Sequence, residues 1–300
     1  MGKNPKTAKK TPTDPFSADE HAYYESLRTS EPEPVQDDSP FGGADRWSIW
    51  YDSEPLQRGP EPHPEWLVTT HGAVDFELGV LKTGKEADVV LLERTDFDTG
   101  RSVLMASKRY RTAEHKLFHR SADYTATRQM KKSRDQRALN KRSAFGRQVA
   151  ATQWAMAEFG ALTKCYEAGL AVPYPVQVHG TELLMEFIGN GRAAAPRLAE
   201  VRADRELLLH LWDQVVHNLD LLTSGGLAHG DLSAYNIVVD ENDDIVLLDL
   251  PQVVDIYMNP KGFEFLERDV ANIGAWFVSK GLDEEYVEDL HRLVMKIALR

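Results

Sequence analysis

The pattern of apolar and polar positions predicts strands in the first half of the chain. Short apolar runs at 88–93 (DVVLLE) and 102–108 (SVLMASK) are separated by a segment containing 98–100 (DTG), which is typical of a turn between two strands. A third apolar run at 183–187 (LLMEF) predicts a short buried strand. We expect ordered structure to begin near residue 66.

The second half of the chain has helical periodicity. Between 204 and 223, apolar residues recur three or four positions apart and therefore share one helical face: Leu208, Leu211, Val215, Leu219 and Leu222. Another helix is expected over 147–168, ended by Gly169, which suits a left-handed C-cap. Two further helices are expected at 263–280 and 283–298.

A hairpin is predicted between these helices. Apolar runs at 237–239 and 245–248 flank the polar segment DENDD, which is typical of a tight connection between two strands. The order of elements predicts an α+β fold in which a small strand-rich lobe precedes a helical lobe.

Residues 1–65 are rich in Pro, Asp, Glu and Ser. A segment this polar buries too little apolar surface to offset the entropy cost of ordering. We therefore expect a mostly disordered acidic and Pro-rich extension. Trp47, Ile49, Trp50 and Tyr51 interrupt it with an aromatic cluster. The sequence leaves open whether this cluster docks on the folded part or binds a partner.

Charge is unevenly distributed along the chain. The net charge is −12, which argues against non-specific nucleic-acid binding by the whole surface, yet 108–147 holds thirteen Lys and Arg against three acids. This basic segment suits contact with the phosphates of ATP, RNA or a partner, and an ordinary solvated loop explains it equally well.

Cys165 is the single cysteine, which excludes an intramolecular disulfide and a thiolate metal cluster. The N-terminal residues lack the apolar core of a secretory signal, and no apolar run approaches the ~20 residues of a membrane span. We therefore expect a cytoplasmic protein that does not enter a membrane.

Candidate chemistry centres on residues 229–236 (HGDLSAYN) and on Asp249. Phosphoryl transfer requires a metal ion that neutralises phosphate charge and a carboxylate that orients the attacking hydroxyl. Asp231 and Asn236 lie five positions apart on a predicted loop, and Asp249 ends the following hairpin. Taken singly, each has a structural explanation, because Asp often caps turns. Together they predict a Mg²⁺–phosphate centre built from hard oxygen ligands.

A candidate phosphate-binding turn precedes the first strand: Thr83, Gly84, Lys85, Glu86 and Ala87. A glycine lets backbone N–H groups approach phosphate without a Cβ in the way, although an ordinary turn explains one glycine as well. The segment is not a Walker A motif.

Lys108 ends the second strand, where a kinase places the lysine that holds the α- and β-phosphates. Glu158, on the next predicted helix, is its expected ion-pair partner, with Glu167 as the rival.

Six motifs occur in an order that resembles the RIO family of atypical protein kinases over roughly 75–280: TGKEA (83–87), SKRYRT (107–112), MEFIG (185–189), LAHGDLSAYN (227–236), LLDLPQ (247–252) and FLERDVANI (265–273). The resemblance implies a two-lobed protein-kinase-like fold with a reduced helical C-lobe that lacks an activation segment. We expect an N-lobe at about 66–185, a hinge at 185–190 and a C-lobe at 191–300.

The resemblance also implies residue roles. Lys108 would contact ATP phosphates, Asp231 would be the catalytic aspartate, and Asn236 and Asp249 would bind Mg²⁺, with Mn²⁺ as an alternative. In the family the aspartate at the position of Asp249 also accepts phosphate during ATP hydrolysis, which gives this residue a second candidate role.

The resemblance further places adenine in the hinge, against the backbones of Glu186 and Ile188 and behind Met185.

Several positions depart from conventional protein kinases. Gly230 stands where those kinases have Arg, Asp249 is followed by Leu250 and Pro251, and no APE motif follows. We therefore expect an enzyme that is not switched by phosphorylation of an activation loop.

In RIO-like proteins a loop near the ATP site joins the lysine strand to the glutamate helix. Here the corresponding basic loop, 112–147, is a candidate for contact with a ribosome or RNA. Ser121, Ser133 and Ser143 are candidate autophosphorylation sites, or ordinary loop serines. The Pro-Gln pair in LLDLPQ and the TGKEA turn are typical of different RIO branches, so the branch stays open.

Three functions remain open on the sequence. The chain could phosphorylate Ser or Thr on a protein, including itself. It could be an ATPase switch in ribosome or ribonucleoprotein maturation, with an aspartyl-phosphate intermediate. A small-molecule kinase is less favoured, because the TGKEA turn is RIO-like and only 51 residues follow Asp249.

Overall fold

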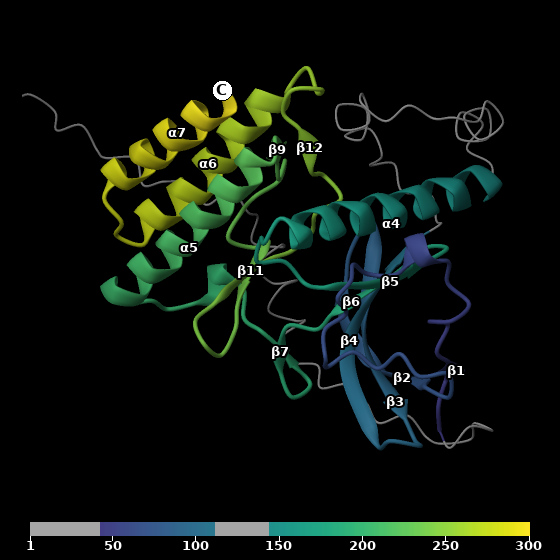
Figure 1. The fold of residues 1–300 in the computed structure, drawn as a ribbon. Helices are drawn as coiled ribbons and strands as arrows, with labels where there is room; N and C mark the ends of the chain where they lie inside the picture. The colour runs from purple at the N-terminus through teal and green to yellow at the C-terminus, as the bar shows by residue number, and fades with distance from the viewer. Residues whose placement is uncertain (1–42, 112–143) are drawn as a thin grey trace, which may run out of the picture.

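An antiparallel sheet and a long helix make up the N-lobe of the computed structural model, which describes residues 43–111 and 144–300 (Figure 1). Within these ranges the largest sheet has the spatial strand order β1-β2-β3-β4-β6-β5. Its strands are β1 (Arg46–Trp47), β2 (Val74–Thr83), β3 (Ala87–Asp96), β4 (Arg101–Tyr110), β5 (Pro175–His179) and β6 (Glu182–Glu186). The predicted strand pair is therefore confirmed as β3 and β4, joined through the expected turn.

Helix α4 (Ala144–Glu167) runs across the sheet and contacts β4, β5 and β6 (Figure 1). It ends where the sequence predicts, because Gly169 adopts a φ of 81°. The chain then enters β5 and β6, which complete the sheet that α4 packs against.

The C-lobe consists of three longer helices and several short elements (Figure 1). The helices are α5 (Arg205–Ser224), α6 (Gly262–Ser279) and α7 (Glu284–Ala298). The short elements are the 3₁₀ helix η3 (Leu198–Glu200) and the paired strands β7 (Gly189–Asn190) with β8 (Ala193–Ala194), β9 (Leu227–Ala228) with β12 (Val254–Asp255), and β10 (Ile237–Val239) with β11 (Ile245–Leu247). The predicted helices and the predicted hairpin are all present.

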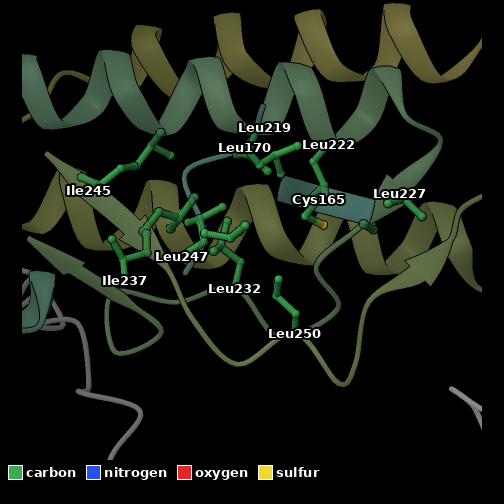
Figure 2. Packing of buried hydrophobic residues seen from close by; sticks show 14 of the residues in the cluster. Cys165, Leu170, Leu219, Leu222, Leu227, Leu232, Ile237, Ile245, Leu247 and Leu250 are labelled. Carbon is green, nitrogen blue, oxygen red and sulfur yellow. The ribbon is translucent and has the colours of Figure 1, made fainter. Parts of the chain in front are cut away.

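Local signals explain where α5 begins. Asp204 is its N-cap, with a side-chain oxygen that accepts from the Leu207 N–H at 2.9 Å. The apolar face predicted from spacing is the buried face of this helix. It lies over the hairpin and the end of α4, where Leu219, Leu222 and Cys165 gather with Leu247 (Figure 2).

The expectation that order begins near residue 66 is wrong. Strand β1 pairs with β2, the 3₁₀ helix η1 (Pro55–Gln57) follows it, and Trp50 is only 3% exposed within a second apolar cluster. We call residues 43–66 the N-terminal strap. The aromatic cluster therefore docks on the N-lobe through Trp50, whereas Trp47 and Tyr51 stay exposed. Residues 1–42 lie outside the described part of the chain.

Strands β2 and β5 were not predicted. Residues 112–143, which hold most of the basic loop and the three candidate serines, lie outside the described part of the chain. None of the helices within 43–111 and 144–300 is long and apolar enough to span a bilayer.

Candidate active site

Lys108 links the two lobes through contacts with two carboxylates. Its Nζ lies 2.7 Å from Oε1 of Glu158 on α4 and 2.6 Å from Oδ1 of Asp249, just beyond β11. The structure thus confirms the predicted pair of Lys108 and Glu158, selects Glu158 over Glu167, and adds Asp249 as a second partner of Lys108. Burial lowers the pKa of Lys108, but the two carboxylates outweigh it and raise that pKa well above its usual value.

Asp249 occupies an unusual backbone conformation. Its φ is 66°, in the left-handed region that non-glycine residues seldom adopt. The charge of Lys108 is the main reason that the pKa of Asp249 falls well below its usual range, so this carboxylate is ionised. Its side chain is 41% exposed, which leaves it accessible from solvent.

The loop from 229 to 236 lies beside Asp249. The Asn236 side-chain N–H donates to the Asp231 carbonyl at 2.8 Å, and the Leu248 N–H donates to the Asn236 carbonyl at 2.7 Å. Partial burial, with the neighbouring carboxylate of Asp249, raises the pKa of Asp231. The spacing predicted from sequence therefore holds in space, because Asp231, Asn236 and Asp249 lie near one another.

Two buried side chains fix the backbone of this loop. The Asp269 carboxylate on α6 is fully buried and accepts from the Gly230 N–H at 2.8 Å and the Leu232 N–H at 2.9 Å. His229 is also fully buried, and because a carbonyl can only accept, its Nε2–H donates to the Leu248 carbonyl at 3.1 Å. Asp269 thus holds the Asp231 segment, and His229 connects it to the residue before Asp249.

The glycine turn joins β2 to β3 and is tightly folded. The Gly84 N–H donates to the Ala87 carbonyl at 2.9 Å, and a Cβ on Gly84 would meet that carbonyl at 2.8 Å. Glycine is therefore required by the tightness of this turn. Thr83 ends β2 and pairs with Asp88 of β3, while Lys85 and Glu86 are exposed at the tip.

Lys82 adds a positive charge that sequence reasoning did not single out. Burial and the nearby charge of Arg197 lower its pKa to about 8, while Asp249 opposes this shift. The charges of Lys82 and Lys108 both lower the pKa of Asp249, so β2 contributes a second lysine to the region of Asp249.

The hinge segment continues from β6. The Glu186 N–H donates to the Tyr174 carbonyl at 2.9 Å, and the Ile188 carbonyl accepts from the Ala195 N–H at 3.0 Å. The Glu186 carboxylate accepts from the Tyr174 N–H at 3.0 Å. The hinge is thereby fixed to the chain that leads into β5 on one side and to β8 on the other.

Comparison with known proteins agrees with this arrangement. A family profile described as the RIO domain matches residues 102–290. The chain belongs to the RIO family. It is 33% identical to the RIO-type serine/threonine-protein kinase Rio1 of Haloferax volcanii over 221 residues, which cover 73% of this chain and 69% of that relative.

Other RIO relatives match over different spans. The Rio1 kinase of Thermoplasma acidophilum is 30% identical over 44% of this chain and 67% of its own length. The serine/threonine-protein kinase RIO3 of Caenorhabditis elegans is 30% identical over 72% of this chain, but over only 39% of its own length. These matches confirm the resemblance and the α+β kinase-like fold.

The donor set of this RIO chain suits a magnesium ion. In the described ranges no three His, Cys, Asp or Glu side chains are arranged to hold a metal by themselves. Mg²⁺ typically takes one or two carboxylates together with substrate phosphates and water, so it does not need such a cage. Asp249 offers an ionised carboxylate, and the amide oxygen of Asn236 is the atom that would complete the protein's share.

Three residues of the RIO site escaped sequence reasoning: Lys82, Tyr110 and Asp269. Asp269 and Tyr110 lie inside the motifs FLERDVANI and SKRYRT, so a signal was present, but their partners are distant in the chain. Tyr110 donates from its hydroxyl to Oε2 of Glu158, 48 positions away. Only the fold reveals such pairs.

Proposed function

We propose that this protein transfers the γ-phosphoryl group of ATP to Ser or Thr on a protein, including its own chain, in a divalent-metal-dependent reaction. The single observation that carries the proposal is the position of the Lys108 ammonium, within hydrogen-bond distance of both Glu158 and Asp249. This lysine–glutamate pair next to a metal-binding aspartate is the arrangement that protein kinases use for phosphoryl transfer. The names of the RIO relatives support the same reaction class.

Each side chain has a role that follows from its chemistry. Lys108 would neutralise the α- and β-phosphates, and Glu158 would keep it in place. Asp231 would accept the proton of the attacking hydroxyl, a task that suits a carboxylate whose pKa is raised by burial and by the nearby Asp249. Asn236 and Asp249 would hold Mg²⁺ or Mn²⁺, and the ion would offset the charge of the phosphates.

The turn between β2 and β3 and the hinge would supply the remaining binding contacts. The turn of Thr83, Gly84, Lys85, Glu86 and Ala87 would cover the phosphates with its backbone. Adenine would meet the backbones of Glu186 and Ile188.

An ATPase switch is the second candidate, favoured by the state of Asp249. This carboxylate is ionised and accessible, as a nucleophile must be. A carboxylate oxygen would bond to the γ-phosphorus while the bond to the β–γ bridging oxygen breaks and ADP leaves. Water would then hydrolyse the aspartyl phosphate. Contact of the basic loop with a ribosome or RNA, the cytoplasmic location and a small-molecule acceptor stay predictions.

The test is incubation of the full chain with γ-labelled ATP and Mg²⁺, following protein-bound label and free phosphate. Asp231→Ala should reduce label on Ser or Thr by about 10²–10⁴-fold, because it removes the general base. Asp249→Asn should abolish transfer. Asp213→Asn, an exposed change on α5, is the matched control and should keep full activity.

The outcomes separate the two candidates. If the label on the protein is stable to acid and both active-site variants lose it, the result supports the protein kinase. Free phosphate with label that hydroxylamine removes supports the ATPase with Asp249 as acceptor. Failure of the wild-type protein to bind ATP would contradict both.

A further inference from the structure

Tyr110 shares Glu158 with Lys108. The two residues lie two positions apart on β4, so their side chains share one face of the sheet. The Tyr110 hydroxyl donates to Oε2 of Glu158, while the Lys108 ammonium donates to Oε1. The same ammonium lies 5.5 Å from the centroid of the Tyr110 ring. One tyrosine thus contacts both members of the ion pair.

Burial makes the hydroxyl contact important. Glu158 is 1% exposed and Tyr110 is 5% exposed, so water cannot readily replace a lost donor. Burial raises the pKa of Glu158 and also raises the pKa of Tyr110 well above its usual value. Tyr110 therefore stays protonated and donates, and its depth in the N-lobe core places it behind the pair rather than against a ligand.

The contact also joins two elements. Tyr110 sits on β4 and Glu158 on α4, so the hydroxyl fixes the helix to the sheet independently of Lys108. In the structure Lys108 has two carboxylate partners. Binding of a metal would draw on Asp249 and weaken its hold on the lysine, which would then depend on Glu158.

We propose that Tyr110 is a positioning residue that holds Glu158 in the orientation that keeps Lys108 aimed at the phosphates when Asp249 turns to the metal. This inference rests on the proposed ATP-dependent function. It assigns the fixed position of α4 to a tyrosine on the neighbouring strand β4.

The test is Tyr110→Phe, which keeps the ring and removes one oxygen. Dissociation constants for ATP, ADP and AMP are measured with Mg²⁺ for the full chain. ATP and ADP should bind about 3–10-fold more weakly, as expected for a buried carboxylate that loses one donor, while AMP binding stays within about 2-fold. Tyr174→Phe is the matched control, since that hydroxyl is also hydrogen-bonded, to the Pro60 carbonyl, but lies away from Glu158. It should leave the ATP-to-AMP ratio unchanged.

A double-mutant cycle shows whether Tyr110 acts through Glu158. In a Glu158→Gln background, Tyr110→Phe should change ATP affinity by less than about 2-fold, because its target is already altered. Equal losses in both backgrounds, or equal losses for ATP and AMP, would overturn the inference. Unchanged ATP affinity in Tyr110→Phe would also overturn it while leaving the proposed function intact, whereas a wild-type protein that binds no ATP would remove the proposed function itself.

Discussion

At the scale of single residues, Lys82 offers the sharpest test of the proposed binding of ATP phosphates. Lys82→Met keeps most of the stem and removes the charge, so ATP should bind about 10-fold more weakly while AMP is unaffected. The expected loss follows from an ammonium close to Asp249, where the phosphates of ATP would lie. Isothermal titration with both nucleotides measures it. Lys296→Met, on the exposed end of α7, is the control.

The same lysine predicts a pH dependence. Because the pKa of Lys82 is lowered to about 8, raising the pH from about 7 to about 9 should convert the ammonium to the neutral amine in the free protein. Phosphate binds the charged form, so ATP affinity should fall over this range. It should fall less in Lys82→Met. An equal pH profile in both proteins would show that Lys82 does not contact the nucleotide.

The residues found from sequence and those missed differ in how their partners are encoded. Asp231 and Asn236 share one loop, so their spacing alone predicts that they meet. Lys108 and Glu158 were paired only because the kinase pattern supplied the pairing. Asp269 and Tyr110 bond to groups 37–48 positions away, and neither residue type is unusual on a helix or strand.

At the scale of elements, the N-terminal strap is the part that composition misjudged. Its polar residues suggest disorder, yet one strand pair, Trp50 and the loop around Gly59 dock it on the sheet. The Gly59 N–H donates to the Val176 carbonyl at 2.8 Å, and His63 Nδ1 lies 2.9 Å from the Tyr174 hydroxyl. A few well-placed contacts outweigh an unfavourable average composition.

Gly59→Ala should detach this strap. A Cβ there would lie 2.0 Å from the Pro175 carbonyl oxygen, and backbone cannot yield as a flexible side chain can. We expect a loss of about 1–3 kcal/mol in the free energy of unfolding, measured by denaturant titration, with faster proteolysis within 43–66. Gly72→Ala is the control, since its Cβ would meet only the end of the Asp98 side chain, at 3.8 Å. Equal stability of the two variants would contradict the docking.

Two of the strands that escaped prediction, β2 and β5, have a physical explanation. Strand β2 contains register shifts between Glu77 and Gly79 and between Val80 and Lys82, which break the two-residue alternation of apolar positions. Strand β5 begins with Pro175 at the edge of the sheet, where a missing N–H is tolerated, but a proline argues against a strand in sequence. Continuous apolar runs were present in β3 and β4 and helical periodicity in α5, and those elements were predicted.

At the scale of the whole molecule, one apolar cluster runs through both lobes. It includes Ala106 and Tyr110 of β4, continues along α4, and reaches Leu219 and Leu247 in the C-lobe. Figure 2 shows its C-lobe part, where Cys165 and Leu170 meet Leu222 of α5. The backbone adds to this link, because the Leu247 N–H donates to the Ala171 carbonyl at 2.8 Å. The two lobes that contribute residues to the candidate active site therefore share a core.

A shared core predicts that the lobes unfold together, although many chains of this size unfold in more than one step. Leu162 on α4 is 1% exposed in this cluster, so Leu162→Ala should cost about 2–5 kcal/mol of unfolding free energy. The denaturant midpoint should fall equally for a fluorescence probe in the N-lobe, Trp50, and one in the C-lobe, Trp212, each followed with the other tryptophans replaced by Phe. Met156→Ala, 39% exposed on the same helix, should shift both midpoints little. If Leu162→Ala lowered one midpoint and left the other in place, the lobes would be separate folding units. The position of Lys108 relative to Asp249 would then depend on the ion pair between these two residues rather than on a common core.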